Sequence, residues 1–204
     1  MDTNRQIRLF WKPLVFSASL VPFMLVAGDL YEVTGHLGPN PIEEIQDRFG
    51  NWGLRFILLA LSVTPLRVHS GWNRLARFRR LLGLFAFFYA LMHFLTWLFL
   101  DQRLLISAIT EDIVKRPFIT IGFAAFLILA ALASTSTAGM RRRLGPRWQK
   151  LHKLVYAAAI LAVGHYWWQV KLDASDPAIY AVILTVLLGY RIRLKRKTGR
   201  PAIA

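Results

Sequence analysis

Residues 81–100 read LLGLFAFFYALMHFLTWLFL and carry no formal charge. A run of about 20 mostly apolar residues is long enough to cross the hydrocarbon core of a membrane as a helix. Its only ionisable groups are Tyr89 and His93. His93 lies about twelve residues into the run, a rise of roughly 18 Å, which places it past the bilayer midplane. The stretch therefore predicts a membrane helix that holds a histidine deep in the bilayer, where an ionisable group usually has a function.

Five further apolar segments accompany this one, so we predict an all-α membrane bundle of six transmembrane helices. The chain is expected to form a single domain over residues 1–204. The predicted helices cover about residues 13–31, 52–66, 81–100, 117–137, 153–170 and 177–191. The basic start of the chain resembles a signal peptide, but no clean small-residue cleavage site follows it. We therefore expect an uncleaved first helix.

The composition excludes several other classes of protein. Hydrophobic residues make up 55% of the 204 residues, which is too many for a soluble domain of this length. The net charge of +15 would suggest nucleic-acid binding in a soluble protein, but here its placement follows the membrane topology. The chain has no cysteine, which excludes disulfides, thiolate metal sites and iron–sulfur clusters.

The charged residues predict the orientation of the bundle, because lysine and arginine accumulate in cytoplasmic loops. Residues 1–12, 67–80, 138–153 and 191–204 carry 20 of the 26 basic residues. Every acidic residue except Asp2 falls in the opposite segments. Both termini are therefore predicted to be cytoplasmic, and the acidic face is predicted to be periplasmic or extracellular.

A second histidine matches His93 in depth. His165 lies about twelve residues into the segment 153–170, which runs in the same direction as the segment 81–100. Two imidazoles at one level on two helices can take both axial positions of a haem between them. The alternative is that each histidine is hydrogen-bonded to a neighbouring helix. His36 and His69 are expected in or beside loops, without a functional role.

The cytoplasmic side gives less definite signals. His152 precedes His165 by a rise of roughly 20 Å and is expected near the cytoplasmic surface, either as a ligand of a second haem or as an interface histidine. Arg80 stands where a symmetrical second pair would need a histidine. Arg79 and Arg80, together with Arg77, could neutralise haem propionates or a phosphate. They could equally reflect the positive-inside rule alone.

Two stretches resemble the ferric-reductase-like transmembrane domain, namely RFRRLLGLFAFFYALMH (77–93) and RWQKLHKLVYAAAILAVGHYWW (147–168). The closer resemblance, which includes VTPLR (63–67) and LHKLVY (151–156), is to the haem-binding membrane subunits of bacterial periplasmic methionine sulfoxide reductase systems. It implies an inner-membrane protein with haem b, one or two per chain, and FMN. By this resemblance His93, His152 and His165 are the haem-associated histidines. The fourth histidine of the NADPH oxidase and ferric reductase pattern is missing, which leaves the number of haems open.

The resemblance also implies a function as a non-catalytic, quinol-oxidising electron-transfer subunit. Electrons would come from membrane quinones or a cytosolic flavin reductase and pass to a periplasmic molybdopterin-containing methionine sulfoxide reductase, which repairs oxidised proteins. The acidic loops at 35–51 and 101–116 are the candidate docking surfaces. The alternatives are a small transporter or proton-relay protein that uses intramembrane histidines, and a passive membrane anchor. Transport is disfavoured because no acidic side chain lies deep in any predicted segment.

Overall fold

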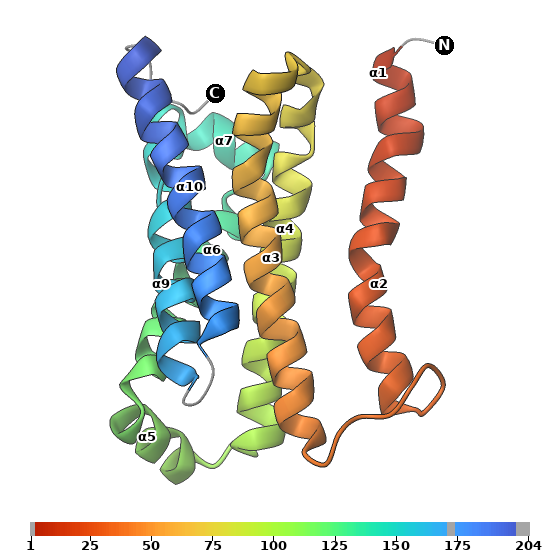
Figure 1. Ribbon diagram of the computed structural model, residues 1–204, viewed down its shortest axis with the longest axis vertical. Coiled ribbons are helices and arrows are strands. Elements are labelled where there is room, and N and C mark those ends of the chain that lie inside the picture. The colour runs from red at the N-terminus through yellow and green to blue at the C-terminus, as the bar shows by residue number, and fades with distance from the viewer. Residues whose placement is uncertain (1–2, 171–173, 199–204) are drawn as a thin grey trace.

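The computed structural model describes residues 3–170 and 174–198, which form helices joined by short connections (Figure 1). Long helices run side by side along the molecule. The elements are α1 (Thr3–Gln6), η1 (Ile7–Trp11), α2 (Lys12–Leu30), α3 (Pro41–Ser70), η2 (Asn73–Arg77), α4 (Arg79–Leu95), η3 (Thr96–Asp101), α5 (Ile106–Lys115), α6 (Pro117–Ser134), α7 (Ala138–Leu144), α8 (Pro146–His152), α9 (Val155–Gln169) and α10 (Ser175–Thr198).

The bundle has two chemically different ends. We call the end that carries α1, α7 and α8 the basic end, at the top of Figure 1. The opposite end carries α5 and the connection 31–40, and we call it the acidic end. The described aspartates and glutamates all belong to segments at the acidic end, which are the end of α2, the connection 31–40, the starts of α3 and α10, the end of η3, and α5.

Within the described residues, five helical stretches are long and apolar enough to cross a membrane, which confirms an all-α membrane bundle. They are Asn4–Leu30, Pro41–Ser70, Asn73–Asp101, Pro117–Ser134 and Ser175–Arg196. The sixth predicted span corresponds to α9, which has only 15 residues. It is short because the chain turns at Lys153 and Leu154, which separates α8 from α9.

The largest difference from the sequence prediction concerns α3. The apolar pattern predicted a helix over 52–66, whereas α3 runs from Pro41 to Ser70. Proline is favoured at the start of a helix, and acidic residues in the first turn, here Glu43 and Glu44, interact favourably with its positive end. The predicted acidic loop 35–51 is therefore mostly helix. Likewise, α5 occupies most of the predicted loop 101–116.

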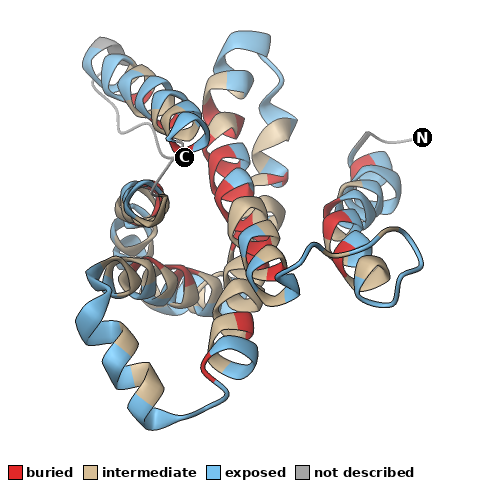
Figure 2. Cartoon of the chain, turned by 60° about the horizontal axis from the view of Figure 1, so that its bottom comes forward, coloured by how far each residue is buried: buried red, intermediate tan, exposed pale blue. Residues whose placement is uncertain are grey.

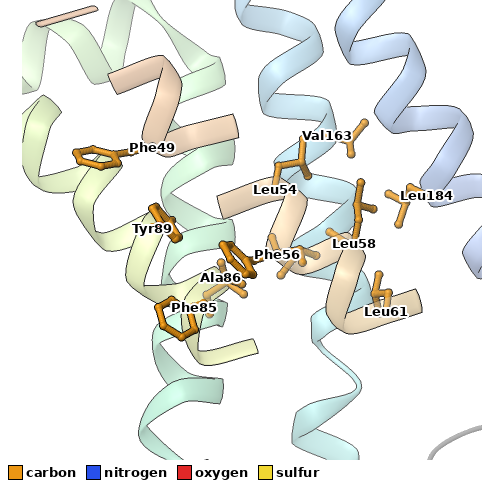
Figure 3. Packing of buried hydrophobic residues seen from close by; sticks show 14 of the residues in the cluster. Phe49, Leu54, Phe56, Leu58, Leu61, Phe85, Ala86, Tyr89, Val163 and Leu184 are labelled. Atoms are coloured by element: carbon orange, nitrogen blue, oxygen red, sulfur yellow. The ribbon is translucent and has the colours of Figure 1, made fainter. Parts of the chain in front are cut away.

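The buried core is centred on α3 and its contact with α4. Figure 2 shows the buried residues concentrated along α3, with exposed residues on the outer faces of the bundle. Rings of Phe49, Phe56, Phe85 and Tyr89 pack together where the two helices meet (Figure 3). The ring of Tyr89, which is 0% exposed, stacks on Phe56 with 5.3 Å between the ring centres. Aromatic packing thus fixes α4 against α3 near His93.

Helix α2 stands apart from the other long helices in Figure 1, and Tyr89 of α4 is one of the residues that join it to them. Pro22 lies inside α2 and has no backbone N–H to donate. The Tyr89 hydroxyl donates to the Ser19 carbonyl at 2.7 Å and accepts from the Phe23 N–H at 3.1 Å. The side chain of α4 therefore completes the hydrogen bonding of α2 one residue after its proline.

Candidate functional site

His93 is held by a carbonyl of the neighbouring helix. Its Nδ1 lies 2.8 Å from the carbonyl oxygen of Gln46 on α3, so Nδ1 carries the proton and donates it. This leaves Nε2 as the nitrogen available to a metal. Gly50 permits the approach, because a Cβ at that position would lie 2.9 Å from Nδ1 of His93.

His165 on α9 has the same surroundings. Its Nδ1 lies 2.8 Å from the carbonyl oxygen of Phe118 on α6, and a Cβ at Gly122 would lie 2.8 Å from that nitrogen. The same spacing separates the members of each pair. Phe118, Gly122 and His165 each come 72 positions after Gln46, Gly50 and His93, in that order. The pairs α3 with α4 and α6 with α9 therefore present two matched imidazoles, each orientated by a backbone carbonyl and given room by a glycine.

The two imidazoles lie close enough to share one metal ion. Their ring centres are 6.1 Å apart, with 79° between the ring planes. Two imidazoles that bind one metal from opposite sides place their ring centres about 6 Å apart, since each metal–nitrogen bond is about 2.0–2.1 Å long. Among the described residues no group of three or more His, Cys, Asp and Glu side chains could hold a metal ion. A macrocycle that supplies its own metal and four ligands fits this pair, because it needs only two axial imidazoles.

A cavity of about 1220 Å³ is lined by both histidines and extends to residues of the acidic end. Its wall is largely apolar and aromatic near the histidines and includes Phe94, Phe126 and Leu129. Asp47 and Arg116 are among the charged residues that line it closer to the acidic end. An apolar cavity suits the ring of a porphyrin, and Lys115 and Arg116 are the lining cations that could pair with its anionic propionates.

His152 does not belong to this cavity. It ends α8, a short helix separate from α9, so the rise predicted for one continuous helix between His152 and His165 does not apply. Its Nε2 lies 3.2 Å from the hydroxyl oxygen of Thr135, and its ring stacks on Trp148 at 3.9 Å. Partial burial lowers the pKa of His152. This shift favours the neutral imidazole, which is the form that binds metals.

The two arginines predicted at the cytoplasmic side differ in position. Arg79 is partly buried, and its Nη2 donates to the hydroxyl oxygen of Thr64 at 2.7 Å. Arg80 is exposed. The 72-residue spacing pairs Arg80 with His152. The same spacing pairs two histidines near the acidic end, so the pair at the basic end contains only one histidine.

Comparison with known proteins places this architecture in a family. The family model described as "Ferric reductase like transmembrane component" matches residues 49–163. A "Protein-methionine-sulfoxide reductase heme-binding subunit MsrQ" of Xanthomonas euvesicatoria pv. vesicatoria (strain 85-10) is 48% identical over 193 residues, which are 93% of this chain and 88% of that protein. The protein of the same name from Herminiimonas arsenicoxydans is 50% identical over 184 residues, which are 89% of this chain and 84% of that protein. The chain therefore belongs to the ferric reductase like transmembrane family and, within it, to the MsrQ heme-binding subunits.

Several residues of the site were not found from the sequence. The carbonyls of Gln46 and Phe118 are backbone groups, which leave no mark in the amino-acid sequence. Gly50 and Gly122 leave a signal that could have been found, because they share the 72-residue spacing of the two histidines.

Proposed function

We propose that the chain is a haem b electron-transfer subunit of a bacterial inner membrane, with His93 and His165 as axial ligands of one haem. The observation that carries this proposal is the matched histidine pair, with ring centres 6.1 Å apart inside one cavity. A bound haem would supply the reversible one-electron change of its iron. The protein would orientate both imidazoles through the Gln46 and Phe118 carbonyls, which also make the ligands more basic.

In the proposed orientation the basic end faces the cytoplasm and the acidic end faces the periplasm, as the positive-inside rule requires. The histidine pair then lies on the periplasmic half of the bundle, since Gln46 and Phe118 both fall near the starts of their helices at the acidic end. This position suits delivery of electrons to a periplasmic acceptor.

The proposed acceptor is a periplasmic, molybdopterin-containing methionine sulfoxide reductase, and the proposed donor is the membrane quinone pool. The names of the relatives support the first part, because they describe heme-binding subunits of a protein-methionine-sulfoxide reductase. The chain would form a heterodimer with that catalytic subunit and support repair of oxidised proteins. These names refer to no flavin, so FMN and a cytosolic flavin reductase stay predictions from the resemblance.

The basic end offers a second, less complete ligand set. His152 would be the ligand of a second haem, and Arg79 and Arg80 would stabilise anionic groups there. The neutral imidazole of His152 supports such a role. The absence of a second histidine at the position of Arg80 argues that any second haem is bound differently from the first.

The test is the absorption spectrum of the purified full-length chain. A reduced minus oxidised spectrum, with haem quantified as its pyridine complex, should show b-type haem. His93→Ala and His165→Ala should each lose most of the haem while the chain still inserts into the membrane. His36→Ala is the matched control, because His36 lies in the exposed connection 31–40. Full haem retention in either cavity variant would overturn the proposed ligand pair.

The same experiment decides between the proposal and its rivals. A proton-relay transporter or a passive membrane anchor would be purified without haem from a haem-replete host. Neither rival explains why each of the two histidines has its own carbonyl and glycine neighbour in the same arrangement, and why both line one cavity.

A further inference from the structure

A carboxylate and an amide meet at the acidic end of the histidine cavity. Asp47 of α3 and Gln169 of α9 both line this cavity, and the Gln169 Nε2 donates to the Asp47 Oδ1 at 3.4 Å. Asp47 directly follows Gln46, whose carbonyl oxygen lies 2.8 Å from the His93 Nδ1. Gln169 lies four residues after His165, so both side chains project from the same face of α9. The pair therefore lies within about one helical turn of the groups that position both histidines.

Among the described residues, Asp47 is the carboxylate of the cavity wall with the weakest hydrogen bonding. Glu43 accepts from the Asn40 Nδ2 at 2.7 Å. Asp101 accepts from the Gln102 Nε2 at 2.9 Å. The bond to Asp47 is longer, at 3.4 Å, and its Oδ2 accepts no hydrogen bond within residues 3–170 and 174–198. An ionised carboxylate can accept several hydrogen bonds, so Asp47 retains capacity for a ligand in the cavity.

The cavity has room for a second ligand besides a haem. Its volume of about 1220 Å³ exceeds the range of roughly 300–1,000 Å³ that is typical of small-molecule pockets. The cations that line it among the described residues are Lys115 and Arg116, at the end of α5 and directly after it. Haem propionates are anionic, so these cations attract them and Asp47 repels them. The side of the cavity formed by α3 and α9 is thus left to a ligand without negative charge.

An aromatic ring and a second amide belong to the same side of the cavity. Asn51 lies four residues after Asp47 on α3, and Tyr166 lies three residues before Gln169 on α9. Each therefore shares a helix face with one member of the pair. Both line the cavity, and Asn51 lies close enough to interact with the Tyr166 hydroxyl. These groups match a neutral aromatic molecule that carries hydroxyl groups.

We propose that Asp47 and Gln169 bind a hydroxyl group of a membrane hydroquinone beside the histidine pair. A hydroquinone is neutral and aromatic, and its hydroxyl donates to the Asp47 carboxylate in a charge-assisted hydrogen bond. The Gln169 amide donates to the oxygen of the same hydroxyl. The inference rests on the proposed function, in which membrane quinones supply the electrons. It places that ligand at the acidic end, close to both histidines.

The experiment measures the binding of heptyl-hydroxyquinoline N-oxide, a redox-inert aromatic molecule with a hydroxyl group and an alkyl tail. Isothermal titration calorimetry gives its Kd for the full-length chain in detergent, and haem per chain and the unfolding midpoint are measured on the same samples. Asp47→Asn removes the charge but keeps an oxygen that can accept from Gln169. Glu43→Gln is the matched control, because it removes the same charge one helical turn earlier on α3, from a carboxylate that accepts from Asn40.

We expect Asp47→Asn to bind the N-oxide about tenfold more weakly than the unchanged chain, because a hydrogen bond to a charged group is replaced by a neutral one. Glu43→Gln should keep the original Kd, and both variants should keep their haem and their unfolding midpoint. The proposal is overturned if the two variants bind the N-oxide equally tightly. If Asp47→Asn is unstable, Gln169→Leu decides, since it leaves the carboxylate in place. Weaker binding by Gln169→Leu supports the site, and an unchanged Kd overturns it.

Haem content separates this result from the proposed function. Haem-free samples in which Asp47→Asn still binds the N-oxide more weakly would reject the haem ligands and support the hydroquinone site. Full haem content with equal Kd values would reject the hydroquinone site and leave the haem ligands in place.

Discussion

Two glycines determine how closely the neighbouring helices approach the central histidines. Glycine inside a helix costs roughly 0.5–1 kcal/mol relative to alanine. Positions 50 and 122 nevertheless need glycine, because a Cβ at either position would lie within 2.9 Å of a histidine nitrogen. The small residue therefore permits the hydrogen bond between the imidazole and the carbonyl one helical turn earlier, at Gln46 or Phe118.

Gly122→Ala tests this role at a single residue. The added methyl group should displace His165 from the Phe118 carbonyl, because the nearest ring atom lies only 2.8 Å from the new Cβ. We expect less haem per chain and a weaker low-spin haem spectrum. Gly83→Ala is the control, since a Cβ there meets nothing within 4 Å. Equal haem content in the two variants would contradict the proposed role of Gly122.

The histidines could be predicted from sequence, whereas their orientation could not. His93 was identified because an ionisable group in an uncharged 20-residue run is costly unless it has a partner or a function. His165 followed from its equal depth. Their hydrogen-bond acceptors are main-chain carbonyls, which any residue provides, so no side chain indicates them. Arg191 was read only as part of the basic cytoplasmic segment, because its burial depends on how α10 packs against α3.

At the scale of a helix, α2 depends on a side chain from another element. Pro22 weakens the hydrogen bonding of α2, and the Tyr89 hydroxyl bonds to both Ser19 and Phe23. Helix α2 stands apart from the other long helices in Figure 1. Its polar attachments to them include this contact and the ion pair between Asp29 of α2 and Arg48 of α3.

Tyr89→Phe removes the hydroxyl and keeps the ring. We expect destabilisation of about 1–3 kcal/mol, because the carbonyl of Ser19 and the N–H of Phe23 lose their buried partner. The measurement is the unfolding midpoint of the purified chain, with Tyr31→Phe as the control because Tyr31 is 78% exposed. Unchanged stability in Tyr89→Phe would show that the α2 contact contributes little.

The prediction of elements succeeded where hydropathy alone defines a helix. The spans 81–100 and 117–137 correspond to α4 with η3 and to α6. It failed for α3, because charged residues over 43–48 interrupt the apolar pattern while the backbone continues as helix. It also missed α5, which lies at the acidic end and has too few apolar residues to resemble a membrane span.

The whole molecule is polarised by charge, and this polarity predicts its orientation in the membrane. The chain has no cysteine, so single cysteines report their exposure without background. Ser107→Cys on α5 should react with a membrane-impermeant maleimide in intact cells. Ser70→Cys, at the end of α3, should react only after the inner membrane is opened, because the basic end is expected in the cytoplasm. The reverse labelling pattern would show that the proposed orientation is wrong.

The 72-residue repeat relates one half of the bundle to the other, and it is more complete near the acidic end. There, a carbonyl, a glycine and a histidine recur in both α3 with α4 and α6 with α9. At the basic end the same spacing pairs His152 with Arg80, which is a cation where the repeat would have a second imidazole. The molecule thus has one symmetrical histidine pair near the acidic end and one asymmetrical pair of positions at the basic end.

Arg80→His would restore the symmetry of that layer. We expect the variant to bind more low-spin haem per chain, because the 72-residue spacing pairs position 80 with His152 as it pairs His93 with His165. The gain should disappear in the double variant Arg80→His with His152→Ala. Arg77→His is the control, because Arg77 is an exposed arginine of η2 outside the repeat pair. If haem content and spectrum stay unchanged, a histidine at position 80 does not act as a haem ligand. The difference between the two ends would then come from the backbone of the basic end and not from the side chain of Arg80 alone.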